Sequence, residues 1–177
     1  STSFTQAALT WAYNNILGYQ RAVVNMSYWG PTYHQWEANS LAALWNNGAL
    51  LISIAGNSGS QGVFYPAGHT NVIGVAGSDE NDGRGRPSGC TSSTTWGSHV
   101  DLVAPYKVYT TTASGSYGSA CGTSFSAPRV AGVAASVWSI HNTESRNQVL
   151  NRLMSTATPL AWSGSGNGLV NHAAAAN

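Results

Sequence analysis

The alternation of helical and short apolar segments along the 177 residues is the feature that most constrains this fold. Apolar side chains recur at helical spacing in four segments, 5–18, 35–47, 124–140 and 144–154, before a short Ala-rich tail. Four apolar runs suited to buried strands are interspersed with them: Arg21–Ser27, Ala49–Ala55, Asn71–Gly77 and His99–Ala104. This alternation predicts an α/β fold in three layers, with a parallel sheet and helices on both faces. No repeat or linker divides the chain, so we treat residues 1–177 as one domain.

Charged residues make up only 7% of the chain, against roughly 25% in an average soluble domain. Seven basic and six acidic side chains create no field that would attract nucleic acid or an anionic membrane, so neither is an expected partner. No apolar run approaches the roughly 20 residues that span a bilayer. Residues 1–4 include no initiator Met and no signal-peptide features, and we expect the chain to begin after a cut or at an artificial boundary. The neutral polar composition favours a secreted or extracytoplasmic protein.

The two cysteines, Cys90 and Cys121, match no metal motif, and two thiols alone do not make a zinc site. One disulfide is typical of a secreted protein. Two buried free thiols are the alternative. Since the sequence gives no Cα separation, both interpretations stay open at this stage.

The segment 79–89 holds five charged side chains and three glycines, which is typical of a solvated loop. Its Asp-Glu-Asn-Asp-Gly run has oxygen ligands that could hold a structural calcium ion. A plain surface turn is the preferred interpretation, because the run matches calcium loops only loosely. No catalytic metal and no other cofactor is expected.

The strongest chemical signal is the string from Gly122 to Pro128, Gly-Thr-Ser-Phe-Ser-Ala-Pro. It places Ser124 at the N-terminal end of an apolar helix, with Pro128 expected in the first turn, where proline is tolerated. The partial positive charge of a helix N-terminus favours an oxyanion forming beside this serine. For an isolated serine, a simple N-cap would be the better interpretation.

A second signal is Ala55–Gly59, directly after an apolar strand. Asn57 at the carboxyl end of a parallel strand can present its amide in the crevice where α/β sheets bind ligands. On this segment alone, an Asn-rich turn is an equally good interpretation.

Together these residues resemble the subtilisin family of serine proteases. The string at 122–128 matches the family's nucleophile motif, Gly-Thr-Ser-x-[Ala/Ser]-x-Pro, and Val-Ala-Gly follows it as in the family. The segments Val24–Ser27, Tyr65–Ala67 and Gly168–Asn171 also resemble family segments. The resemblance extends from about residue 5 to 177 and covers only the later part of the catalytic domain.

The resemblance implies Ser124 as the nucleophile and Asn57 as an oxyanion donor, together with the Ser124 backbone N–H. It also implies a cis peptide bond between Tyr65 and Pro66. By the same resemblance, the substrate cleft is lined by residues from three segments: Ser27, Tyr28, Trp29 and Gly30; Ile54, Ala55 and Gly56; and Thr123.

The rest of the family's catalytic triad is missing, since its order along the chain is Asp, His and then Ser. The sequence has no Asp-Thr/Ser-Gly after a strand and no His-Gly-Thr opening a helix. Asp101 is interpreted as a structural residue. The five histidines are interpreted as structural or surface residues: His34, His69, His99, His141 and His172. We therefore expect the triad Asp and His, and the family's first strands, to come from a separate N-terminal chain of the same precursor. Without that chain a central strand would become an open sheet edge.

Three departures from the family pattern qualify the resemblance. Phe125 follows the nucleophile where the family usually has Met, and Tyr28-Trp29 replaces the usual Leu-Gly in the cleft wall. Cys121, three residues before Ser124, has no general counterpart; bonded to Cys90 it would brace the nucleophile loop.

The resulting expectation is a serine endopeptidase that hydrolyses peptide or protein substrates through an acyl-enzyme on Ser124. Two alternatives stay open. One is a subtilisin-like transpeptidase or macrocyclase, in which an amine displaces the acyl-enzyme. The other is a catalytically inactive module that binds peptides without cutting them.

Overall fold

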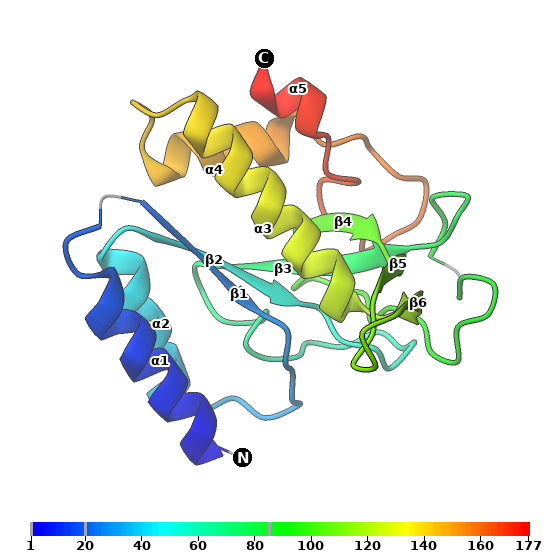
Figure 1. Cartoon of the computed structure of the whole chain (residues 1–177), viewed down its shortest axis with the longest axis horizontal. Coiled ribbons are helices and arrows are strands. Elements are labelled where there is room, and N and C mark those ends of the chain that lie inside the picture. Colours follow the sequence, from blue (N-terminus) through cyan, green and yellow to red (C-terminus); the bar gives the residue numbers. More distant parts are fainter. Residues whose placement is uncertain (1, 20, 85) are drawn as a thin grey trace.

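The computed structural model describes residues 2–19, 21–84 and 86–177. At its centre is a four-stranded parallel sheet in the order β1-β2-β3-β4 (Figure 1). The strands are β1 (Ala22–Met26), β2 (Ala49–Ile54), β3 (Val72–Ser78) and β4 (Leu102–Pro105). The α/β fold with a parallel sheet is therefore confirmed.

Five helices complete the described chain: α1 (Thr2–Ile16), α2 (Gln35–Asn46), α3 (Thr123–Ile140), α4 (Arg146–Ser155) and α5 (His172–Ala176). The first four lie at segments predicted to be helical, with α1 displaced toward the N-terminus by two to three residues at each end. The fifth, α5, lies in the Ala-rich tail, for which no helix was predicted. None of these helices is both long and apolar enough to cross a membrane.

The side chains of β2 alternate between two apolar clusters, which shows that helices cover both faces of the sheet. Leu50, Ile52 and Ile54 pack with the buried side of α3. Ala49 and Leu51 point the other way, toward α1 and α2. Figure 1 shows α1 and α2 below the strands and α4 and α5 above them, with α3 crossing in front. The three-layer prediction is confirmed.

The last predicted strand, 99–104, begins later than expected. His99 and Asp101 lie before β4, which starts at Leu102. Val100 N donates to Gly97 O in a turn, and the first backbone hydrogen bond to β3 is that from Asp101 N to Gly74 O. The first three residues of the predicted run, 99–101, therefore precede the strand and lead into it.

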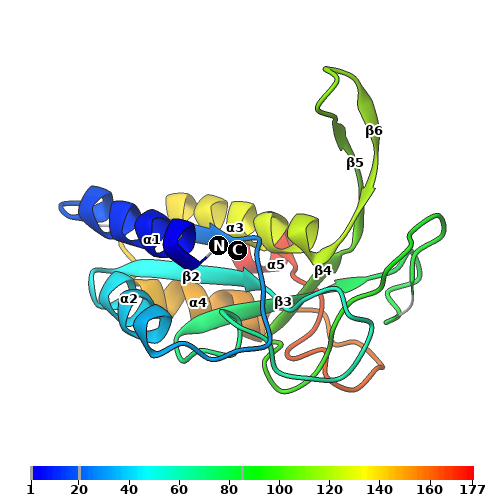
Figure 2. The same ribbon diagram turned by 90° about the horizontal axis from the view of Figure 1, so that it is seen from below.

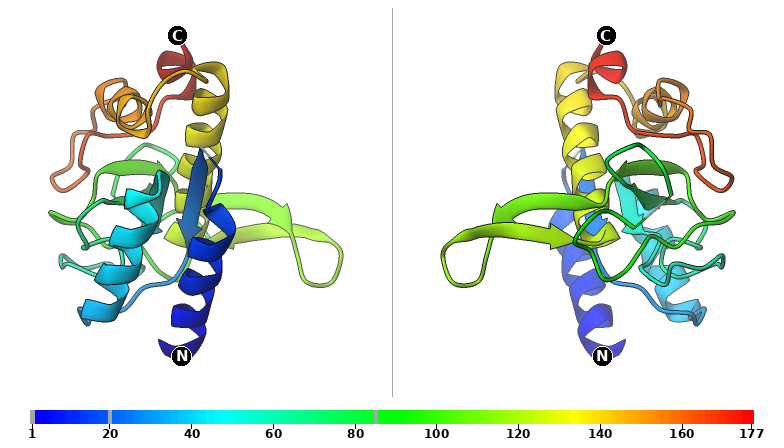
Figure 3. Two further views of the ribbon diagram at one scale, coloured as in Figure 1. Left: turned by 90° about the vertical axis from the view of Figure 1, so that its left-hand side faces the viewer. Right: turned by 90° about the vertical axis from the view of Figure 1, so that its right-hand side faces the viewer.

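A β-hairpin that the sequence analysis did not predict connects the sheet to α3. Its strands, β5 (Lys107–Thr111) and β6 (Tyr117–Cys121), pair antiparallel. Neither strand has a buried apolar face, so neither matches the buried apolar runs from which the other strands were predicted. Figures 2 and 3 show the hairpin projecting from the body of the molecule. Its second strand ends one residue before the Gly122 that precedes α3.

Cys90 and Cys121 form a disulfide, with their Cα atoms 5.8 Å apart. The choice between a bridge and free thiols is thereby decided. The bridge joins the loop after β3 to the last residue of β6, directly before the segment that carries Ser124.

Removal of this bridge in a C90A/C121A double variant should lower the free energy of unfolding by about 3 to 4 kcal/mol, because the closed loop spans 31 residues. For a chain of this size, that loss corresponds to a fall in Tm of roughly 6 to 16 °C. Calorimetry checks the value, and a reducing agent should shift the Tm of the unaltered protein to the same extent. An unchanged Tm in the double variant would contradict the bracing role.

Candidate active site

Ser124 is the second residue of α3 and is half-buried. Gly122 precedes the helix with φ of 145°, a conformation that side chains disfavour, so the sharp entry depends on this glycine. Pro128 lies in the second turn of α3, not in the first turn as predicted, because the helix starts at Thr123. It has no N–H to donate to the carbonyl four residues earlier, that of Ser124. Ser27 Oγ donates to that carbonyl instead, at 3.2 Å.

The side-chain amide of Asn57 is held in a defined orientation by Thr123. Asn57 Oδ1 accepts hydrogen bonds from Thr123 N and from Thr123 Oγ1, each at 2.9 Å. Within the described residues, Nδ2 of this amide has no protein partner and is free to donate. Both amide atoms lie 3.8 Å from the position of a Cβ on Gly122, so the amide faces the turn that carries Ser124.

The loop that carries Asn57 is supported by Thr95, a residue that the sequence analysis did not single out. Thr95 N donates to Gly56 O, and Ser58 N donates to Thr95 Oγ1. Gly56 has φ of 114°, and a Cβ at this position would lie 2.8 Å from Thr95 Oγ1 and 3.2 Å from Trp29. This close packing brings the loop and the wall residue Trp29 into contact.

Some of the predicted cleft residues are linked to the turn that carries Ser124: Ser27 bonds to the Ser124 carbonyl, and Thr123 Oγ1 bonds to the Gly56 carbonyl. Trp29 packs edge-to-face on Phe64, with ring centroids 4.7 Å apart. Gly30 exchanges two backbone hydrogen bonds with Tyr65, the residue before a cis peptide bond to Pro66, which confirms that prediction. The predicted wall residues Ile54 and Ala55 are fully buried, so their side chains support the wall from behind.

No histidine in the described part of the chain is hydrogen-bonded to Ser124. His69 pairs with Glu37, His172 with Ser136, and His141 with the Ala176 carbonyl. His34 stacks on Trp36. His99 binds the Ala55 carbonyl at 3.1 Å.

Asp101 has a structural contact of the kind predicted from the sequence. Its carboxylate accepts a hydrogen bond from Gly74 N at 2.8 Å. Burial raises the pKa of Asp101, and the Gly74 hydrogen bond opposes that rise.

The described residues hold no cluster of three or more His, Cys, Asp or Glu side chains that could bind a metal. In the loop 79–89, the Asp79 carboxylate accepts from the backbone N–H groups of Asn81 and Gly83. This is the pattern of a turn closed by its own aspartate. A structural calcium ion there stays a prediction.

The sequence analysis also missed Glu37, which is only 5% exposed. Its signal was present in the helix pattern. Glu37, Leu41 and Leu44 share one face of α2 at a spacing of four and three residues, and both leucines are fully buried. A carboxylate on the apolar face of a helix indicates a buried polar contact.

Comparison with known proteins gives one family. The model of the Subtilase family matches residues 1–174. Subtilisin DY from Bacillus licheniformis is 38% identical over 176 residues, which cover 96% of this chain and 61% of that protein. The chain thus spans about three fifths of this relative.

Solved structures of several proteases share the fold. The prenylagaramide maturation protease PagA superposes with a TM-score of 0.81 at 26% identity, over 99% of this chain and 66% of its own. A lanthipeptide protease gives a TM-score of 0.83 over the same shares; its identity of 21% makes it evidence for the fold alone.

His99 should make stability depend on pH, because burial lowers its pKa below the ordinary value of 6.5. As the pH falls through about 6.5, the unfolded chain takes up a proton that the folded chain does not. Stability is therefore fully present above that pH and decreases below it, until the lower folded pKa is reached. In H99Q, the amide can still donate to the Ala55 carbonyl but does not titrate.

We expect Tm to fall less between pH 7 and pH 5 in H99Q than in the unaltered protein, as measured by calorimetry. H172Q changes an exposed histidine in the same way and serves as the control. An equal pH dependence of Tm in H99Q and the unaltered protein would contradict the assignment of this effect to His99.

Proposed function

The chain belongs to the subtilase family, and on this basis we propose that it forms the nucleophile-bearing part of a serine endopeptidase. One observation carries the proposal. Ser124 lies at the N-terminus of α3, and the Asn57 amide is fixed with its donor side free beside the same turn. A serine hydroxyl and a preorganised amide donor at one helix end are the groups that acyl transfer requires.

In the proposed reaction, Ser124 Oγ attacks the carbonyl carbon of a peptide bond and passes its proton to a general base. The resulting oxyanion is stabilised by Asn57 Nδ2 and the Ser124 backbone N–H, at the positive end of α3. The base then returns the proton to the departing amine, and water releases the acyl group from Ser124. The reported loss on removing such an amide donor, about 100- to 1000-fold in turnover, was measured in subtilisin itself and is borrowed here from a relative.

The general base and its orienting carboxylate are proposed to come from a separate N-terminal chain of the same precursor. No base among the described residues contacts Ser124, and an unactivated hydroxyl is a weak nucleophile. β1 is an edge strand in the described sheet, and its first three residues, 22–24, are apolar and only half-buried. Beside it lies a hollow between β1 and α3, lined by Val23, Ala135 and Trp138 among others. On α1, Phe4 is 78% and Trp11 is 68% exposed.

We propose peptides or proteins as substrates, with Ser27–Gly30 and Gly56 along the cleft and Thr123 behind it. No cofactor takes part in the proposed chemistry. The disulfide supports an oxidising, extracytoplasmic location.

The nucleophile is tested by labelling the protein, together with its N-terminal chain, with a fluorophosphonate and mapping the labelled peptide. These reagents modify activated serines, so rapid labelling at Ser124 is expected, and S124A should abolish both labelling and peptide hydrolysis. S136A, which alters a serine farther along α3, is the matched control and should label normally. A folded complex that does not label at Ser124 would contradict the proposed peptidase activity. The remaining alternative would then be a module that binds peptides without cutting them.

The two-chain arrangement is tested by producing this chain with and without the N-terminal chain. Alone, its open β1 edge should cause self-association, which light scattering coupled to gel filtration detects. Together, the two chains should elute as one soluble complex. A stable, soluble monomer of this chain by itself would overturn the proposal.

A further inference from the structure

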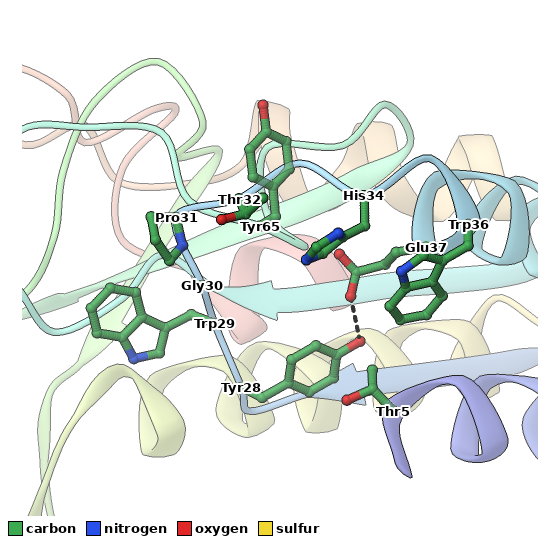
Figure 4. Close-up of a pocket in the computed structure, with 10 residues that line it drawn as sticks. All are labelled: Thr5, Tyr28, Trp29, Gly30, Pro31, Thr32, His34, Trp36, Glu37 and Tyr65. Atoms are coloured by element: carbon green, nitrogen blue, oxygen red, sulfur yellow. Dashed lines mark hydrogen bonds between the residues drawn. The ribbon is translucent and has the colours of Figure 1, made fainter. Parts of the chain in front are cut away.

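A pocket of about 180 Å³ opens beside the cleft wall (Figure 4). It is lined by the residues that follow Ser27 along the chain, from Tyr28 to Thr32, together with the start of α2 and Tyr65. Because Ser27 hydrogen-bonds to the backbone of Ser124, the wall that begins at the nucleophile leads directly into this pocket. A peptide lying along that wall would bring one side chain to the opening.

The carboxylate of Glu37 lines this pocket and is almost fully buried. Tyr28 OH donates to Oε1 at 3.2 Å, and His69 Nε2 donates to Oε2 at 2.9 Å. Burial and the neighbouring Glu37 carboxylate raise the pKa of Tyr28, so this phenol remains a donor. An ionised carboxylate offers about four acceptor positions. Two partners therefore leave part of its capacity for a donor that enters the pocket.

The remaining walls suit a flat cation. Figure 4 shows Trp29 on one side of the pocket and Trp36 on the other, with Tyr28 and Tyr65 between them. Aromatic faces attract cations, and the guanidinium of arginine stacks on them while its N–H groups stay free to donate. The described lining includes no Lys or Arg that would repel such a group, and its histidine, His34, stacks on Trp36.

We propose that this pocket is a specificity site that selects a cationic side chain of the substrate, arginine before lysine, through Glu37. The guanidinium enters between the tryptophans and donates to the free acceptor positions of the carboxylate. Glu37 thus determines which peptides bind, and it takes no part in bond cleavage. The inference rests on the proposed peptide-cleaving function and names a class of substrate for it.

The test uses the complex of this chain with its N-terminal chain and a set of fluorogenic peptides. Each position around the cleaved bond is varied in turn among Arg, Lys and Met. At one position away from the bond, kcat/KM should be about ten- to a hundredfold higher for Arg than for Met, the range expected of hydrogen bonds to a charged group. If no such position prefers a cation over Met, the proposal is overturned without any variant.

Glu37→Gln tests the assignment to this residue. The amide keeps the size of the side chain, can accept from Tyr28, and can donate to the other tautomer of His69. In E37Q the Arg-to-Met ratio should fall at least about fivefold at that position, with kcat/KM for the Met peptide nearly unchanged. E80Q removes a carboxylate from the loop 79–89, outside the pocket, and should retain the full preference. Loss of activity on all peptides in equal proportion would show a structural role and contradict the proposal.

Binding to S124A separates this inference from the proposed function. Fluorescence anisotropy with labelled Arg and Met peptides needs no catalysis. Tighter binding of the Arg peptide that E37Q abolishes would support the pocket even if the chain hydrolyses nothing. Hydrolysis without any cation preference would support the peptidase and reject the pocket. If E37Q fails to fold, the Arg-to-Met ratio of the unaltered complex decides.

Discussion

The hydrogen bonds from Thr123 to Asn57 Oδ1 are the contact on which the site depends. They join the loop after β2 to the first residue of α3, across 66 positions of sequence. An amide that rotated to exchange its oxygen and nitrogen would turn Nδ2 toward the Thr123 backbone N–H, which can only donate, so this bond fixes the donor side of Asn57. The fold therefore orients the proposed oxyanion donor before any substrate arrives, which is the condition for electrostatic stabilisation at low reorganisation cost.

The start of α3 is held from two further directions. Pro128 leaves the Ser124 carbonyl without its helical partner, and Ser27 supplies the missing donor, so the cleft wall and the nucleophile are positioned by one hydrogen bond. On the other side, β6 ends at Cys121, which the disulfide fixes to the loop after β3. A short turn between two such anchors has little freedom to move Ser124.

The wall that begins at Ser27 connects the open edge of the sheet, the nucleophile and the Glu37 pocket. Its upstream neighbour is β1, where a further strand can pair, and its downstream end reaches α2. The proposed completion of the sheet and the proposed selection of substrate thus involve adjacent parts of one chain segment. The bulky Tyr28-Trp29 pair, which departs from the family pattern, forms part of the pocket, and Tyr28 satisfies one oxygen of its carboxylate.

Local pattern was enough to predict much of the fold. Continuous apolar runs marked β2 and β3, a 3.6-residue period marked α3, and the string at 122–128 marked the nucleophile turn and the family. The hairpin from Lys107 to Cys121 was missed because its strands have no buried apolar face, and the turn at His99 was read as strand because apolar content alone does not end an element.

The sequence by itself determined whether most segments form helices or strands, and which types of residue lie at their ends. The tertiary structure decided which distant groups meet: Cys90 with Cys121, Asn57 with Thr123, and Glu37 with Tyr28 and His69. Spacing along a chain fixes the direction of a side chain relative to its own helix or strand. The distance between two elements follows only from how their apolar faces pack, and the chemistry of this site depends on those distances.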